Sequence, residues 1–138
     1  MRHVRASHGV PIAFMKRQTN QRKAIVRVLD EAEQALSVED VLERGRNLVA
    51  SLNRATVYRN LRALTDGGMA RRIVHPELGT LYEREGKPHH HHFHCRRCDR
   101  LFEVAGCALD VSGSAPAGFH TESHEVFLYG TCPACSKR

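Results

Sequence analysis

The chain has 138 residues, with 21 lysines and arginines against 15 aspartates and glutamates, for a formal net charge of +6. This length accommodates one domain of average size or two very small ones, and the positive charge favours a polyanionic partner. No apolar run approaches the roughly 18 residues that suggest a membrane span. The basic N-terminus, residues 1–5, lacks the apolar stretch of a signal peptide. We therefore expect a cytoplasmic protein that binds no membrane.

Two helices are predicted after a basic, aperiodic arm over residues 1–18. From Gln21 onward, apolar residues recur at the spacing of one helical stripe, and Thr19 or Asn20 can cap this helix. The stripe consists of Ile25, Val28, Leu29 and Ala32. The second helix is predicted to begin at the capping box Ser37-x-x-Asp40, in which aspartate replaces the usual glutamate, and to run to about Gly45.

A third helix is predicted to begin after Asn53, to bury Val57, Leu61 and Leu64, and to end at Gly67-Gly68. Its remaining positions combine cations with an aromatic ring and a hydroxyl. Such side chains can bind guanine edges and thymine methyl groups in the major groove of DNA; the alternative is an ordinary solvated face. The candidate DNA-binding residues are Arg54, Thr56, Tyr58, Arg59 and Arg62.

Two short strands are predicted next, over residues 69–74 and 80–83, with a turn at residues 75–79 between them. Three helices followed by a hairpin make a winged helix. Arg71 and Arg72 would then lie where the wing meets DNA phosphates. This order of elements, together with the net charge, favours nucleic-acid binding over a merely solvated helix face.

Cysteines dominate the C-terminal half, which we expect to begin after the break at Gly86-Lys87-Pro88. Cys95-x-x-Cys98 and Cys132-x-x-Cys135 supply four thiolates at metal-ligand spacing, and such a set suits a closed, structural zinc site. Redox dithiols or unmetallated thiols are the alternative, but disulfides are rare in the cytosol. For Cys107 we favour a small, partly buried thiol over a metal-binding or redox role.

A run of histidines, His89, His90, His91, His92 and His94, precedes the first cysteine pair. In an extended segment, alternate side chains point to opposite sides, so one stretch can supply two metal sites. The alternative is a solvated polyhistidine linker. Strands are also predicted over residues 101–104 and 125–129, with weak helical character at best over residues 110–118.

Three segments, taken in order, resemble the ferric uptake regulator family of bacterial metal-dependent repressors. They are Ala55-Thr56-Val57-Tyr58-Arg59, the run from His89 to Cys98, and Tyr129-Gly130-x-Cys132-x-x-Cys135. The resemblance covers the chain from about Arg17 onward. It implies an α+β protein with a winged-helix DNA-binding domain over residues 1–86 and a metal-binding α/β dimerisation domain over residues 87–138. It also implies a homodimer that binds palindromic double-stranded DNA operators.

The resemblance implies three metal sites. A structural Zn²⁺ would be held by Cys95, Cys98, Cys132 and Cys135. A regulatory divalent metal, Zn²⁺, Fe²⁺ or Mn²⁺, would be held by Glu83, His90, His92 and Glu103. An additional site would map to His89, His91, Asp110 and His124.

Two departures from the family pattern bear on the regulatory site. Ala35 stands where many members have a further histidine ligand, which leaves the site one ligand short unless His75 or a residue of the arm takes that place; this change weakens a peroxide-sensing interpretation. Zinc-sensing members often have cysteine where this chain has Glu83, which favours an iron- or manganese-type site without excluding zinc.

We therefore predict a metal-responsive transcriptional repressor without a small-molecule substrate. The alternatives are a peroxide-sensing repressor of the same family and a zinc-stapled interaction or metal-storage module that does not bind DNA. An enzyme is disfavoured, because the chain lacks the His-x-Glu of zinc deaminases and the His-Glu-x-x-His of zinc proteases.

Overall fold

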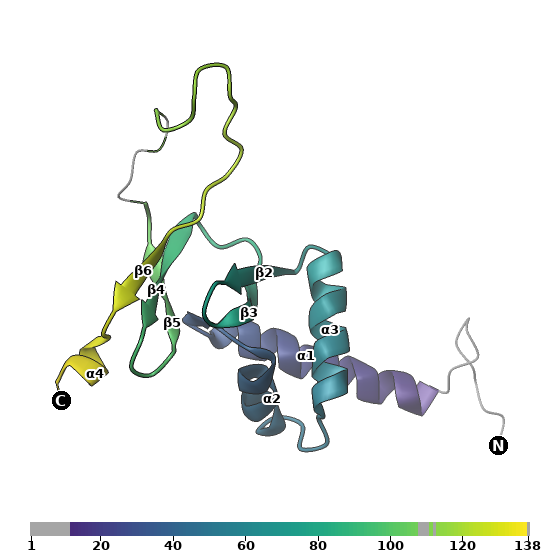
Figure 1. Cartoon of the computed structure of the whole chain (residues 1–138). Helices are drawn as coiled ribbons and strands as arrows, with labels where there is room; N and C mark the ends of the chain where they lie inside the picture. The colour runs from purple at the N-terminus through teal and green to yellow at the C-terminus, as the bar shows by residue number, and fades with distance from the viewer. Residues whose placement is uncertain (1–11, 108–110, 112, 138) are drawn as a thin grey trace, which may run out of the picture. The chain divides into compact units, whose positions relative to one another are not determined.

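The computed structural model describes residues 12–107, 111 and 113–137, with side chains from residue 18 onward (Figure 1). The chain forms two compact units. The first contains the described residues up to Ala32 and the segment from Leu36 to Glu85. The second contains Glu33–Ala35 and the chain from Gly86 onward. Helices and sheets are both present, which confirms the predicted α+β class.

The first unit consists of three helices and a hairpin, as a winged helix requires. The hairpin strands β2 and β3 pair antiparallel from Ala70 opposite Arg84 to His75 opposite Gly79. An isolated bridge joins Leu36 to Tyr82. The elements are α1 (Ile12–Glu31), α2 (Val38–Arg46), α3 (Arg54–Asp66), β2 (Ala70–His75) and β3 (Gly79–Arg84).

Helix α1 begins at Ile12, nine residues before the predicted start at Gln21. The predicted caps Thr19 and Asn20 therefore lie inside the helix, and that prediction was wrong. The residues from Ile12 to Glu31 include no glycine or proline, so no residue breaks the helix before the amphipathic stripe begins. The apolar stripe marks the buried part of a helix, and α1 extends beyond that part.

Helix α2 begins at the predicted capping box. The Ser37 hydroxyl accepts a hydrogen bond from the Asp40 N–H at 3.1 Å, and the Asp40 carboxylate accepts one from the Ser37 N–H at 3.1 Å. Gly45, near the other end, permits a close approach, because a Cβ atom there would lie 2.7 Å from Leu52 Cδ1. The absence of a side chain at Gly45 thus allows Leu52 to enter the core.

The core of the first unit combines residues of all three helices with the hairpin. The residues buried in it are Ile25, Val28, Leu29, Ala32, Leu36, Val38, Val41, Leu52, Val57, Leu61, Leu64, Ala70 and Tyr82. They include the predicted stripes of the first and third helices. Most of the free energy that favours folding of this unit therefore comes from apolar burial.

The second unit is a four-stranded sheet with strand order β1-β5-β4-β6. Strand β4 pairs antiparallel with β5 and parallel with β6. Strand β1 belongs here because Gln34 and Ala35 pair with Phe102 and Leu101, although the sequence analysis placed them in the first domain. The elements are β1 (Gln34–Ala35), β4 (His90–Cys95), β5 (Leu101–Ala105), β6 (Phe127–Gly130) and α4 (Pro133–Ser136).

A long excursion connects β5 to β6 and projects from the sheet (Figure 1). Its described residues, 106, 107, 111 and 113–126, contain neither helix nor strand. Within the described part of the chain, no helix is both long and apolar enough to cross a membrane.

Leu61 provides a test of the first unit's core. We expect Leu61→Ala to lower the free energy of unfolding by about 2–5 kcal/mol, because it leaves a cavity at a fully buried position. Leu48→Ala is the control: Leu48 is 42% exposed, so the change should stay within about 0.5 kcal/mol. Urea unfolding followed by helical circular dichroism measures this unit, because α1, α2 and α3 supply nearly all of the described helix. Equal losses in the two variants would contradict the packing described here.

Candidate metal centres and nucleic-acid interface

Helix α3 presents an exposed polar face opposite its buried stripe. The Asn53 side chain caps it by accepting a hydrogen bond from the Thr56 N–H at 2.9 Å. Tyr58 is 48% exposed, and Arg59 and Arg62 are also exposed. This face offers the hydrogen-bond donors and the aromatic ring that a helix needs to contact base edges in a major groove.

The other two candidate residues of α3 have partners within the first unit. Thr56 is buried, and its hydroxyl accepts a hydrogen bond from Arg59 Nη2 at 3.4 Å. Arg54 is exposed and forms an ion pair with Glu39, with Nη2 and Oε1 2.7 Å apart. Exposed ion pairs contribute only about 0–1 kcal/mol, so a phosphate can compete with Glu39 for this guanidinium.

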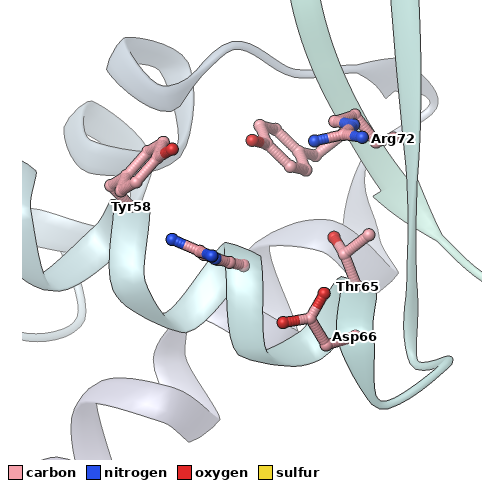
Figure 2. A pocket seen from close by; sticks show the side chains of 6 residues that line it. Tyr58, Thr65, Asp66 and Arg72 are labelled. Carbon is pink, nitrogen blue, oxygen red and sulfur yellow. The ribbon is translucent and has the colours of Figure 1, made fainter.

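A hollow of about 390 Å³ lies between α3 and the hairpin (Figure 2). Figure 2 shows Tyr58, Thr65 and Asp66 on the helix side and Arg72 on the strand side. Burial raises the pKa of the Tyr82 phenol, so its hydroxyl stays protonated and able to donate. The hollow thus combines hydrogen-bond donors and two guanidinium groups with one carboxylate; its lining is Tyr58, Arg62, Thr65, Asp66, Arg72 and Tyr82.

His75 has a structural role in the wing. Its Nδ1 atom accepts hydrogen bonds from the N–H groups of Glu77 and Leu78, each at 3.0 Å. These bonds close the predicted turn between β2 and β3. Because Nδ1 accepts these two hydrogen bonds, it is not available to a metal ion. If His75 replaces the histidine ligand that is absent at position 35, it must therefore bind the metal through Nε2.

The four paired cysteines come together in the second unit, and their sulfur atoms all lie within 4.8 Å of one another. Cys98 Sγ and Cys132 Sγ are 4.0 Å apart. Tetrahedral zinc with Zn–S bonds of about 2.3 Å separates its sulfurs by about 3.8 Å, so the spacing fits that ion. All five cysteines of the chain lie among the described residues, and none forms a disulfide.

Two tight turns position these sulfurs. Cys95 ends β4, and the chain then reverses into β5 with the Asp99 N–H donating to the Cys95 carbonyl at 2.8 Å. Asp99 has φ 58°, a left-handed conformation that aspartate tolerates better than most residues. Cys132 is the N-cap of α4, which carries Cys135. Arg97 joins the two turns by donating to the Cys135 carbonyl at 3.1 Å.

The spacing of β4 and β6 also depends on Gly130. A Cβ atom at this position would lie 3.0 Å from Phe93 Cζ. Phe93 and Gly130 belong to adjacent parallel strands, and Cys95 pairs directly with Gly130 in the register. The Cys132 N–H donates to Cys95 Sγ at 3.3 Å, so the two cysteine turns are already in contact through the backbone.

The protein environment separates the pKa values of the thiols. Burial raises the pKa of Cys95, but hydrogen bonds from backbone N–H groups, the one from Cys132 foremost, outweigh burial and lower it to about 6. The interaction with the Cys132 side chain, followed by burial, raises the pKa of Cys135 to about 12. Burial also raises the pKa of Cys98. A cation must therefore displace protons from the latter two thiols when it binds all four.

The predicted regulatory residues are distributed over both units. His90 and His92 lie on one side of β4 with ring centroids 4.9 Å apart, as strand alternation requires. Glu103 pairs with His92 in the register, but its carboxylate contacts the Lys87 ammonium. Glu83 belongs to the first unit, where its carboxylate lies 3.7 Å from Arg71 Nη1. Its participation with the two histidines stays a prediction.

The opposite side of β4 gives a result that the sequence analysis missed. His89, His91 and His124 approach one another, and the fourth member of the cluster is Cys107. The predicted ligand Asp110 lies outside the described residues. Burial, with His89 and His124 nearby, lowers the pKa of His91 and so favours the neutral imidazole that binds metals. No short-range pattern marks Cys107, because it meets His91 only through the β4–β5 pairing.

Comparisons with known proteins identify relatives of this chain. The ferric uptake regulator family model matches residues 15–129. Ferric uptake regulation protein 2 of Mycolicibacterium fortuitum is 30% identical over 125 residues, covering 87% of this chain and 86% of that protein. The zinc uptake regulation protein of Mycobacterium tuberculosis is 30% identical over 123 residues, covering 86% and 94%.

The fold also agrees. The structure of the Helicobacter pylori ferric uptake regulator aligns with a TM-score of 0.70 and 22% sequence identity, covering 99% of this chain and 97% of that one. The extent of the family match, with these relatives, establishes that the chain belongs to the ferric uptake regulator family of metal-responsive transcriptional regulators.

Proposed function

We propose that this regulator is a repressor that binds palindromic operator DNA as a homodimer and responds to divalent metal. In this proposal residues 1–86 contact DNA, and residues 87–138 bind metal and pair the chains. The observation that carries the proposal is the exposed face of α3, where Tyr58, Arg59 and Arg62 stand free of the core. The family membership supports it, because its members regulate transcription.

The residues of α3 would have different roles in DNA binding. Arg59 and Tyr58 would contact base edges, and Arg62 would bind either bases or phosphate. Thr56, which is buried, would act by holding the Arg59 guanidinium through its hydroxyl. Arg54 would exchange its partner Glu39 for a phosphate. Each such phosphate contact releases counterions, so affinity should fall steeply with salt.

The four cysteines would hold a structural zinc ion. Structural zinc can supply an apparent binding free energy of ~10–16 kcal/mol, whereas whole domains are typically stable by ~5–15 kcal/mol. Few large apolar side chains of the second unit are fully buried, Leu101 being one. We therefore assign most of that unit's stability to the metal rather than to apolar packing.

The regulatory metal would bind to Glu83, His90, His92 and Glu103. Glu103 would first have to leave Lys87, so the metal competes with an ammonium group for this carboxylate. Histidine and carboxylate ligands suit Fe²⁺, Mn²⁺ and Zn²⁺ alike. A metal that binds more tightly to the DNA-competent arrangement shifts the population toward that arrangement. By linkage, operator DNA must then raise metal affinity by the same factor.

Arg59 tests the DNA-binding face. We expect Arg59→Ala to weaken operator binding by about 1–3 kcal/mol per half-site, because a bidentate contact to a base is lost. Arg27→Ala is the charge-matched control: Arg27 is an exposed arginine of α1 paired with Glu31, and its loss should leave operator specificity unchanged. Fluorescence anisotropy with operator and scrambled DNA at fixed salt measures both. Unchanged operator affinity in Arg59→Ala would overturn the assignment of α3.

Zinc removal tests the division of stability between the units. Chelation of the zinc, or Cys95→Ser, should abolish amide protection in β4 and β6 and leave α3 protected, because the core of the first unit contains no cysteine. Hydrogen exchange read peptide by peptide distinguishes the units. Loss of protection in α3 to the same extent would show that the first unit also depends on the metal.

His90 tests the regulatory site. We expect His90→Ala to reduce the metal-dependent gain in operator affinity at least about tenfold, since losing even an outer-shell partner costs ~10–100-fold in metal affinity. Zinc content and amide protection should not change. His120→Ala is the control, because His120 is exposed and lies in the excursion before β6. Titrations with zinc, manganese and ferrous iron at buffered concentrations would identify the metal. If His90→Ala protein kept the full metal-dependent gain in operator affinity, His90 would be excluded as a ligand.

A further inference from the structure

A second cluster of potential metal ligands stands on the side of β4 opposite His90 and His92. Its four donor atoms belong to His89, His91, Cys107 and His124 and all lie within 4.8 Å of one another. The donors come from three segments of the second unit: the start of β4, the residue that follows Gly106 after β5, and the chain just before β6.

All four donor atoms lie close enough together to share one ion. His91 Nε2 is 3.0 Å from Cys107 Sγ, and Cys107 Sγ is 3.4 Å from His124 Nε2. His89 Nε2 and His124 Nε2 are 3.2 Å apart. A tetrahedral ion with Zn–N bonds of about 2.05 Å and a Zn–S bond of about 2.3 Å separates nitrogens by about 3.3 Å and sulfur from nitrogen by about 3.6 Å.

Hydrogen bonding alone accounts poorly for this convergence. An imidazole Nε2 atom has either one proton or one lone pair, yet His124 Nε2 approaches both Cys107 Sγ and His89 Nε2. Here two imidazole nitrogens approach the same sulfur, and a third nitrogen approaches one of them. A cation at the centre is a common partner for all four donors. The pKa of His91, lowered by burial, agrees with a neutral ligand at this position.

We propose that Cys107 supplies a thiolate to a metal centre completed by His89, His91 and His124. The centre has three nitrogen donors and one sulfur donor. Thiolate favours zinc and related borderline-soft cations over manganese and magnesium, which prefer oxygen donors. When the cation binds, the Cys107 thiol releases its proton to solvent and forms a metal–sulfur bond. This proposal does not depend on DNA binding and is tested without DNA.

The centre has a structural consequence for the excursion between β5 and β6. Cys107 and His124 lie at the two ends of this excursion, His91 belongs to β4, and His89 directly precedes that strand. A cation that joins them closes the excursion into a loop at its base. Residues 113–122 should therefore exchange their amide hydrogens more slowly after the second cation is bound.

Cobalt tests the ligand directly, because a cobalt–thiolate bond gives a near-ultraviolet charge-transfer band that cobalt bound only by nitrogen and oxygen lacks. The full-length protein, with zinc in the four-cysteine site, is titrated with Co²⁺, and elemental analysis of each sample verifies that the zinc is retained. We expect the wild-type chain to develop the band. Cys107→Ser should lose it, with affinity for this cation reduced at least about tenfold, since even outer-shell changes cost ~10–100-fold.

Two further variants make the result decisive. His120→Ala changes an exposed histidine of the same excursion that is outside the cluster, and it should keep the band. Asp110→Asn tests the carboxylate that the family pattern places in this site. The thiolate assignment would be overturned by a band of equal intensity in Cys107→Ser protein or by the lack of any band in the wild-type chain. It would also be overturned if Asp110→Asn lost affinity for the cation and Cys107→Ser did not. Cys107 is exposed, so its replacement should leave the fold intact, as amide protection in β4 would verify.

Discussion

The convergence of four cysteine sulfurs is the constraint on which the second unit depends. Strand β4 contributes to each candidate metal group of this unit: Cys95 at its end, and His90, His91 and His92 along its length. The turn after β4 and the short helix α4 have no extensive apolar core to hold them together. The backbone contacts between the two turns hold the ends of β4 and β6 together, and the proposed sulfur ligation would add to them.

Strand β4 supplies two separate groups of candidate metal ligands because its side chains alternate between its two sides. His90 and His92 point to one side, while His89 and His91 point to the other and meet Cys107 and His124. His94 shares the first side by alternation, but its Nε2 atom lies 3.1 Å from Asp99 Oδ1 in the hairpin turn. The histidine run is thus divided between two candidate metal groups and a contact with Asp99.

Features set by neighbours in the chain could be predicted from the sequence. The capping box at Ser37, the apolar stripe of α3 and the paired cysteines all follow from spacings of a few residues. The start of α1 could not be predicted in this way, because periodicity reports burial and not helix length. Cys107 was assigned a minor role because its approach to His91 depends on the register between β4 and β5, which local patterns do not specify. The contact between Lys87 and Glu103 escaped prediction for the same reason.

Gly130 carries no ligand atom, yet its lack of a side chain allows β6 to lie close beside the Phe93 ring of β4. The ring of Phe93 stands so close to its Cα that a methyl group would fit only with displacement of the ring or the strand. If the strand gives way rather than the ring, β6 shifts relative to β4, and Cys132 follows two residues after Gly130. The position of Cys132 relative to Cys95 therefore depends partly on hydrocarbon packing at a residue that binds nothing.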